Sequence, residues 1–459
     1  MMSQVSDENR TRRIFESDIT DLAFDGKAVG EIGGKVTFFD AGLPGEKVRG
    51  EIVRKKARYN FARVTEIITR SPDRVPAPCT HFGICGGCTW QDLDYDRQLY
   101  FKRKQVVDCL LHIGRIGDIE VEPTVGSEKQ FFYRNKMEFS LNTTAENGFV
   151  LGLHPRGHFD QIFNLKECLL QSETSNRIAA WFRSFVTEKN IPVYDILKHT
   201  GHLRFLAIRE ARRTGQIMLN IVTAEGTLPF QSEMLESARQ AVPEITTIVQ
   251  NVNGGKSNIA RGEYENILYG PGYIEEKLLD RTFRIYANSF FQTNTEQAER
   301  LYRTAYEILA PQKEDRLLDL YCGTGTIGLC ASGLVQTVVG IELEPSAVRA
   351  AHENAALNDI SNIQFHIGSV QDILRNNPEL LDGITCTVID PPRAGLHPKA
   401  LRRLAELNYP RLVYISCNPA TFARDAAYLI QAGYKIGRII PVDMFPHTMH
   451  IELVAGFHK

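Results

Sequence analysis

The feature that most constrains the fold of this chain is a series of short apolar segments from about residue 290 onward. They read RLLDLYC, TVVGIE, IQFHIG, CTVID and RLVYIS, and segments with helical patterning separate them. Short, continuously apolar strands that alternate with helices indicate a parallel sheet buried on both faces. We therefore expect an α/β domain in the C-terminal part of the chain.

The first of these strands leads into the glycine loop LLDLYCGTGTIGL, in which Gly323, Gly325 and Gly328 form a G-x-G-x-x-G pattern. In dinucleotide-binding folds this loop makes a tight turn at a crevice, and an acid about 20 positions on binds the ribose. Here Asp319 lies inside the strand itself, and Glu342 ends the next strand. The pattern predicts a site for a nucleotide-like cofactor, and an NAD-dependent oxidoreductase is one reading of it.

Three later segments carry reactive side chains near strand ends. Asp390 precedes two prolines in VIDPPRAGLHP, and a strand cannot continue its ladder through proline. Cys417 follows the strand RLVYIS between polar neighbours, a position that favours a nucleophile. Glu452 lies in DMFPHTMHIELVAGF beside His447 and His450.

The interior Asp319 and the loop CGTGTIG resemble motif I of the Rossmann-like S-adenosylmethionine methyltransferases, and the residue types at the later strand ends fit one kind of methyl transfer. A thiolate that adds to C6 of a pyrimidine makes C5 nucleophilic enough to attack a methylsulfonium. A base must then remove the C5 proton so that the thiolate can leave. Cys417 and Glu452 match the two tasks, and the thiol would need a pKa below the free value of about 8.5.

Taken in chain order, the motifs resemble those of the RNA uracil-C5 methyltransferases over nearly the full chain. The motifs are NSFFQTN at 288–294, the glycine loop, DPPR at 390–393, SCNP at 416–419 and MFPHTMHIE. The resemblance implies a Rossmann-like domain that uses S-adenosylmethionine, with Cys417 as nucleophile and Glu452 as proton acceptor. The cofactor-binding residues that it implies are Gln292, Tyr321, Gly323, Gly325, Thr326, Glu342, Ser369 and Asp390. Thr326 and Ser369 depart from the family, which often has Asn at the first position and Asn or Asp at the second.

A group of cysteines forms a second candidate site. CTHFGICGGC contains Cys79, Cys85 and Cys88 in a C-x5-C-x2-C spacing, and Cys168 is a distant fourth. Four thiolates suit zinc or an iron–sulfur cluster equally well. The resemblance, which is greatest to the 23S rRNA enzymes, favours a [4Fe-4S] cluster over zinc, in a structural or RNA-ordering role. The remaining cysteines are expected to fill apolar core positions: Cys109, Cys322, Cys330 and Cys386.

The first 75 residues read as short strands separated by Gly-rich breaks, which predicts a small closed β-barrel. This barrel resembles a TRAM domain, an RNA-binding module. Its strand region around 54–63 interleaves cations with aromatic rings, a pattern suited to a nucleic-acid strand: Arg54, Lys55, Lys56, Arg58, Tyr59, Phe61 and Arg63.

We therefore expect three domains. They are a TRAM-like barrel at 1–75, a cluster-bearing α/β domain at 76–288 and the catalytic domain at 289–459, with the Pro-rich SPDRVPAP as the first linker. A long helical stretch at about 97–122 is expected to pack on the catalytic domain despite its position in the chain.

The composition of the 459 residues restricts the partners. A formal charge of −2 argues against binding to nucleic acid through bulk charge alone. The polar start does not predict a secretory signal. The sequence contains no run of about 18 apolar residues, so no membrane span is predicted. We expect a cytoplasmic monomer.

The expected substrate is a uridine of 23S rRNA, and a uridine of the tRNA T-loop is the main alternative. A cytosine-C5 enzyme is less favoured, because RNA enzymes of that kind typically carry a second active-site cysteine and none stands beside Cys417. A non-catalytic RNA-binding or ribosome-assembly protein also stays open.

Overall fold

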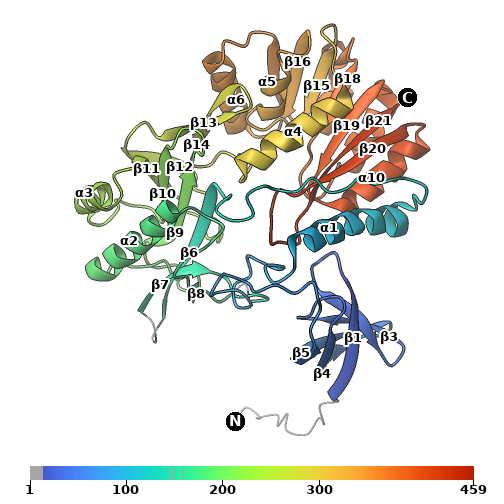
Figure 1. Ribbon diagram of the computed structural model, residues 1–459. Helices are drawn as coiled ribbons and strands as arrows, with labels where there is room; N and C mark the ends of the chain where they lie inside the picture. Colours follow the sequence, from blue (N-terminus) through green and yellow to red (C-terminus); the bar gives the residue numbers. More distant parts are fainter. Residues whose placement is uncertain (1–13, 145, 147, 159) are drawn as a thin grey trace, which may run out of the picture.

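The computed structural model describes residues 14–144, 146, 148–158 and 160–459, so the polar start of the chain lies outside the described residues. Figure 1 shows a small barrel, a central sheet with its helices and a C-terminal sheet with helices on both faces. The described residues include no helix that is both long and apolar enough to cross a membrane.

The N-terminal strands form the predicted closed barrel, in the order β1-β2-β3-β5-β4, and pairing of β1 with β4 closes it. Closure leaves no free strand edge. Its core contains Phe39, Val48 and Trp90, the last from the segment that follows the barrel. The strands are β1 (Ile14–Leu22), β2 (Ala28–Ile32), β3 (Lys35–Phe39), β4 (Lys47–Lys55) and β5 (Tyr59–Thr69).

The central sheet has the order β12-β11-β10-β9-β6-β7-β8. Its middle strands β9 and β10 are buried along their whole length, and the buried residues of β9 include Arg204, Arg209 and Glu210. Helices α2 (Glu173–Lys189) and α3 (Gln231–Ala241) pack on this sheet over one apolar core. The strands are β6 (Lys136–Thr144), β7 (Gly148–Leu153), β8 (Phe163–Asn164), β9 (Leu203–Glu210), β10 (Ile217–Thr223), β11 (Ile245–Val252) and β12 (Tyr264–Tyr269).

A two-stranded hairpin, β13 (Tyr273–Leu278) and β14 (Arg281–Tyr286), leads to the C-terminal sheet of order β17-β16-β15-β18-β19-β21-β20. The predicted apolar strands form its parallel part, as expected. They are β15 (Arg316–Leu320), β16 (Thr337–Glu342), β17 (Ile363–Ile367), β18 (Cys386–Ile389) and β19 (Arg411–Ser416), and β20 (Lys435–Val442) and β21 (Glu452–His458) follow.

The strand order sets where a ligand can bind. It reverses between β15 and β18, and ligands of open α/β sheets bind in the crevice beyond the strand ends at such a point. Antiparallel β21 lies between β19 and β20, so the sheet differs from the dinucleotide-binding order 3-2-1-4-5-6. Helices cover both faces: α4 (Thr295–Leu309), α5 (Thr326–Ala331), α6 (Pro345–Leu357), α7 (Val370–Asn376), α8 (Pro378–Leu381), α9 (Pro398–Leu407) and α10 (Pro419–Gln431).

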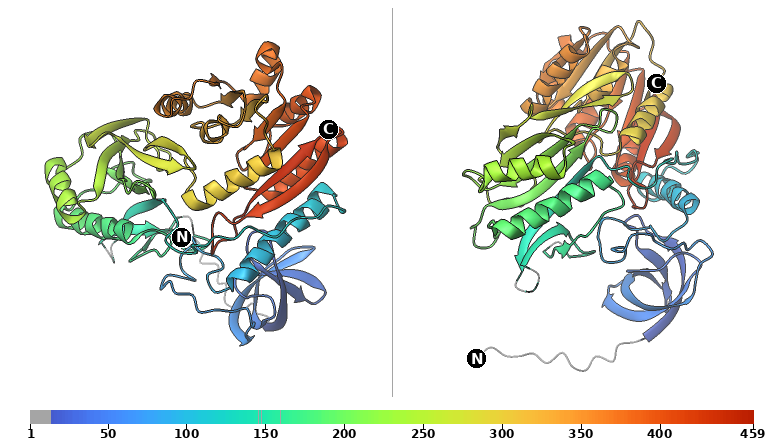
Figure 2. Two further views of the ribbon diagram at one scale, coloured as in Figure 1. Left: turned by 45° about the horizontal axis from the view of Figure 1, so that its top comes forward. Right: turned by 60° about the vertical axis from the view of Figure 1, so that its left-hand side comes forward.

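One helix from the N-terminal half completes this layer. Helix α1 (Tyr95–Cys109) and the π-helical turn η1 (Leu110–Gly114) pack beside α10 and β20, as both views of Figure 2 show. The helical stretch is shorter than expected at 97–122. It ends where Arg115 adopts a left-handed conformation with φ 55°, and residues 115–124 continue without helix.

Candidate active site

The glycine loop follows β15 and turns sharply, with Tyr321 at φ 64° and Gly325 at φ 80°. A Cβ on Gly325 would lie 2.9 Å from the ring of Phe365, so only glycine fits there without strain. Tyr321 is a non-glycine residue in a left-handed conformation, and such strain persists where the surrounding structure enforces it, often at functional sites.

Two acids hold this loop. Buried Asp319 accepts a hydrogen bond from Gly328 N at 2.9 Å, and burial raises the pKa of its carboxyl to about 8. Glu342, at the end of β16, accepts from Gly323 N at 3.0 Å with one oxygen. Its other oxygen accepts from the backbone N–H groups of residues 343 and 344. A carboxylate has about four acceptor sites, and three are used here, so Glu342 can still accept from one ligand hydroxyl.

The loop opens into a cavity of about 1,410 Å³, lined by segments of both the central and the C-terminal parts. A pocket for one small ligand measures roughly 300–1,000 Å³, so this cavity has room for two ligands. Of the predicted cofactor-binding residues, seven line it: Gln292, Tyr321, Gly323, Thr326, Glu342, Ser369 and Asp390. Gly325 does not, and instead precedes α5 against Phe365.

The two predicted catalytic side chains line the same cavity. Cys417 follows β19, and the antiparallel register pairs Ser416 with Leu453, so Cys417 lies opposite Glu452 at the next step. Asn418 caps α10 and donates to the carbonyl of Arg393 at 3.0 Å, which ties the SCNP and DPPR loops together.

The electrostatics of the pair differ from expectation. Burial, with the nearby carboxyl of Glu452, raises the pKa of the Cys417 thiol to about 11, whereas thiolate chemistry called for a value below 8.5. Burial also raises the pKa of Glu452 well above its usual range. Burial raises the pKa of Asp390 to about 7. Arg393 opposes the shift at Cys417 and at Glu452 but does not cancel it. Without ligands, the protonated thiol is therefore the dominant form at neutral pH.

The four predicted cluster cysteines all line a second cavity, of about 370 Å³. None forms a disulfide. Burial, with the neighbouring cysteines, raises the pKa of Cys88 to about 12. In the described part of the chain, no group of three or more His, Cys, Asp or Glu side chains is arranged to hold a metal ion. Gly87, Arg134 and Thr293 line both cavities, so the two sites adjoin.

Sequence reasoning missed several residues that shape the active-site cavity. The segment 261–265 of the central part lines it, and the Gly-rich NGGKSN just before was a usable signal. Asn135 donates to the carbonyl of Gln292 at 2.9 Å, and buried Arg209 donates to that of Ser289. No local pattern could reveal these contacts, because the partners lie far apart in the chain.

Comparison with solved structures supports a functional class. The tRNA (uracil-54, C5)-methyltransferase of Pyrococcus abyssi, solved in complex with S-adenosyl-L-homocysteine, aligns with a TM-score of 0.78 and 32% identity. The alignment covers 96% of this chain and 100% of that one. By fold and by its crevice, the protein is an α/β methyltransferase.

The sequence comparisons give the family. The family described as tRNA (uracil-5-)-methyltransferase matches residues 224–457. An uncharacterized RNA methyltransferase of Chlorobaculum tepidum is 39% identical, over 97% of this chain and 96% of the relative. Another, of Halalkalibacterium halodurans, is 38% identical over 96% of each. The chain belongs to the RNA uracil-C5 methyltransferase family, which confirms the resemblance noted from its motifs.

Proposed function

We propose that this enzyme methylates C5 of a uridine in RNA through a transient bond between Cys417 and C6 of the base. The observation that carries the proposal is the position of Cys417 opposite Glu452, in one cavity with the glycine loop. S-adenosylmethionine would supply the electrophilic methyl group. The cavity volume leaves room for this cofactor and an unstacked base together.

The residues of the chain take the following parts. Glu342 has one free acceptor site for a ribose hydroxyl, and the glycine loop lets the backbone approach the cofactor. Cys417 adds to C6, and Glu452 then takes the C5 proton, so that the ring double bond re-forms and the thiolate leaves. The proposed cofactor contacts are Gln292, Tyr321, Gly323, Gly325, Thr326, Glu342, Ser369 and Asp390.

The raised pKa of Glu452 makes its carboxylate a stronger proton acceptor, and binding must leave this group ionised before the C5 proton is removed. The raised pKa of Cys417 means that binding must favour the thiolate, and the positive charge of a bound sulfonium acts in that direction. Trapping on 5-fluorouridine RNA tests the nucleophile, because that base has no C5 proton to lose. We expect a covalent adduct with the wild type and none with Cys417→Ala.

The RNA target that we propose is 23S rRNA. A tRNA uridine is the second candidate, since the aligned tRNA enzyme covers 96% of this chain. That coverage includes the barrel region, so the barrel does not distinguish the two substrates. Mapping of 5-methyluridine in rRNA and tRNA from cells with and without the gene tests both. If cells without the gene keep 5-methyluridine in both rRNA and tRNA, the result would favour a non-catalytic role.

For RNA binding we propose the barrel face around β5. Arg54, Lys55, Lys56 and Arg58 are exposed there. Tyr59 packs against Phe38 and Phe61, with ring centroids 5.7 and 5.5 Å away. Cations beside partly exposed rings suit a single strand with stacked bases. This face supports the TRAM-like interpretation of residues 1–75, and the three-domain division stays a proposal with it.

We infer that Cys79, Cys85, Cys88 and Cys168 hold a [4Fe-4S] cluster, with zinc as the less favoured occupant. Four free thiols around one cavity are a donor set that fits either. The cysteines would fix the segment 79–88 against the central sheet, and no step of the methyl transfer uses them. Iron, sulfide and zinc analysis of anaerobically purified protein tests the assignment, and stoichiometric zinc would reverse it.

A further inference from the structure

The loop between β20 and β21, residues 443–451, lines part of the active-site cavity. Phe445, Thr448 and His450 line the cavity from this loop. Glu452 is the first residue of β21 and directly follows the loop. The backbone path of the loop therefore sets where the Glu452 carboxylate lies relative to Cys417.

Other parts of the chain hold this backbone at every step from 443 to 447. Five consecutive carbonyl oxygens accept hydrogen bonds from donors outside the loop. The donors are Gln297 Nε2 for residue 443 (2.8 Å), Asn294 Nδ2 for 444 (3.1 Å), Lys102 Nζ for 445 (3.0 Å), Tyr133 Oη for 446 (3.1 Å) and the N–H groups of Thr89 and Trp90 for 447 (2.8 and 3.0 Å). These bonds pair the backbone carbonyls of residues 443–447 and restrict the path of this irregular segment.

Helix α1 supplies a buried charge to this loop. Lys102 and Asp443 have fully buried side chains, and Lys102 Nζ lies 2.5 Å from Asp443 Oδ1. The same oxygen accepts from Phe445 N at 3.0 Å, and the other accepts from Tyr95 Oη at 2.8 Å. A buried ion pair is weak evidence for stability, since apolar residues of the same volume often serve as well. The bonds to Phe445 point to a positional role instead.

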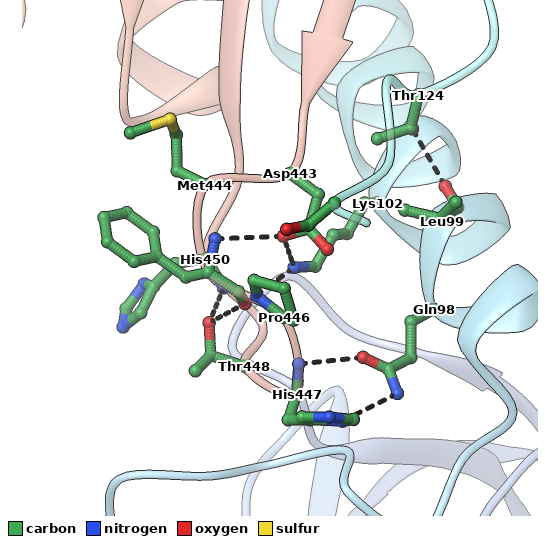
Figure 3. A network of polar contacts seen from close by, with 12 residues as sticks. Gln98, Leu99, Lys102, Thr124, Asp443, Met444, Pro446, His447, Thr448 and His450 are labelled. Atoms are coloured by element: carbon green, nitrogen blue, oxygen red, sulfur yellow. Dashed lines mark hydrogen bonds and ion pairs between the residues drawn. The ribbon is translucent and has the colours of Figure 1, made fainter. Parts of the chain in front are cut away.

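Gln98, one turn earlier on α1, also contacts this loop. Gln98 Oε1 accepts from His447 N at 2.9 Å, while Gln98 Nε2 donates to the carbonyls of Trp90 (3.0 Å) and Leu93 (2.8 Å). His447 has φ 66°, a left-handed conformation that is costly for a non-glycine residue and needs such support. Figure 3 shows both α1 side chains pointing into the loop. Neither Lys102 nor Gln98 lines the active-site cavity.

We propose that Lys102 and Gln98 are positioning residues for the proton-removal step, because they hold the loop that presents Glu452. The inference rests on the proposed function. In that reaction the thiolate of Cys417 forms the S–C6 bond, and C5 takes the methyl group from the sulfonium. Glu452 then accepts the C5 proton, and the electrons of that C–H bond restore C5=C6 and expel the thiolate. A displaced Glu452 leaves the first two steps intact and slows the last.

The test is Lys102→Met, assayed on uridine RNA with S-adenosylmethionine. We expect kcat to fall at least tenfold, since a misplacement of about 1 Å can cost about 100-fold, while KM for the cofactor changes less than about threefold. The methylated enzyme–RNA adduct should accumulate on denaturing gels, as it should with Glu452→Gln. Lys104→Met is the matched control. Lys104 lies on the same helix and pairs with Asp21 and Asp108 near the surface, so turnover should persist without adduct.

The outcomes separate cleanly. A folded Lys102→Met enzyme with normal kcat, or with less adduct than the wild type, overturns the inference. Should this variant lose its cooperative unfolding transition, the double variant Lys102→Met/Asp443→Leu removes both buried charges, and the same two readouts apply to it. If Glu452→Gln itself accumulates no adduct, the proposed function fails and the inference with it. Adduct with Glu452→Gln but not with either Lys102 variant overturns the inference alone.

Discussion

The most direct physical test concerns the protonation of Cys417. Burial and the Glu452 carboxyl raise the pKa of this thiol to about 11 in the ligand-free protein. A free cysteine with a pKa of about 8.5 is roughly one-quarter thiolate at pH 8, whereas Cys417 would be about 0.1% thiolate. Since a thiolate of higher pKa is also more nucleophilic, alkylation of Cys417 by iodoacetamide should run about 10- to 25-fold slower than that of a free thiol at pH 8, and rise about tenfold per pH unit up to pH 10.

The assay is mass-spectrometric quantitation of the alkylated Cys417 peptide between pH 7 and pH 11. Samples with and without ligand are compared by the pH at which the alkylation rate reaches half its maximum (the midpoint). The absolute rates are not compared, because a bound ligand also shields the thiol. S-adenosylmethionine should move the midpoint to lower pH than S-adenosyl-L-homocysteine does, since only the former carries a sulfonium charge. Glu452→Gln should also lower the midpoint, because it removes a group that disfavours the thiolate.

A midpoint below pH 8.5 in the ligand-free protein would refute this reasoning. It would mean that the folded site already favours the thiolate, and that neither cofactor nor RNA binding is needed to lower the pKa of Cys417. Equal midpoints with the two ligands would refute the role given to the sulfonium charge, and the proposed adduct on C6 would need another source of thiolate.

Three further outcomes are expected. Gly325→Ala should lower the free energy of unfolding by about 1–3 kcal/mol in denaturant titrations, because its Cβ would meet Phe365 at 2.9 Å and φ is 80°; an unchanged midpoint would contradict the tight turn. Cys88→Ser should reduce iron from about four atoms per chain to below one, and unchanged iron would exclude this ligand. Tyr59→Ala should weaken RNA binding by about 1–3 kcal/mol and Arg58→Ala should lower the salt slope of log K by about one; equal affinity for the wild type and both variants would remove the barrel face from the interface.

Much of the catalytic part could be predicted from local patterns. The strands β15–β19 and the glycine loop are encoded by short apolar runs and by residues whose backbone needs are specific, such as Gly325. The prolines after Asp390 and Cys417 marked the strand ends at the crevice. These signals are local, so a single sequence carries them.

The rest depends on contacts between distant segments. Gly325 is predicted to bind the cofactor, and that stays a prediction; that it also fits closely against Phe365, a residue of β17, could not be read from the local pattern. The proposed chemistry needs a low pKa at Cys417, but the burial and the neighbouring Glu452 that raise this pKa depend on contacts between β19 and β21 that the local sequence does not show. No pattern around Lys102 predicts its buried pair with Asp443, because a lysine in a polar stretch is expected at the surface.

The docking of α1 on the C-terminal sheet has a consequence for how the chain is made. At about 5–20 residues per second, a ribosome needs roughly 20–70 s to add the 341 residues that separate Lys102 from Asp443. Throughout that interval a helix whose apolar side belongs against α10 and β20 has no surface to cover it. The nascent protein thus exposes the apolar side of α1 until the C-terminal part of the chain has been made. This exposure makes it a candidate for chaperone protection during translation.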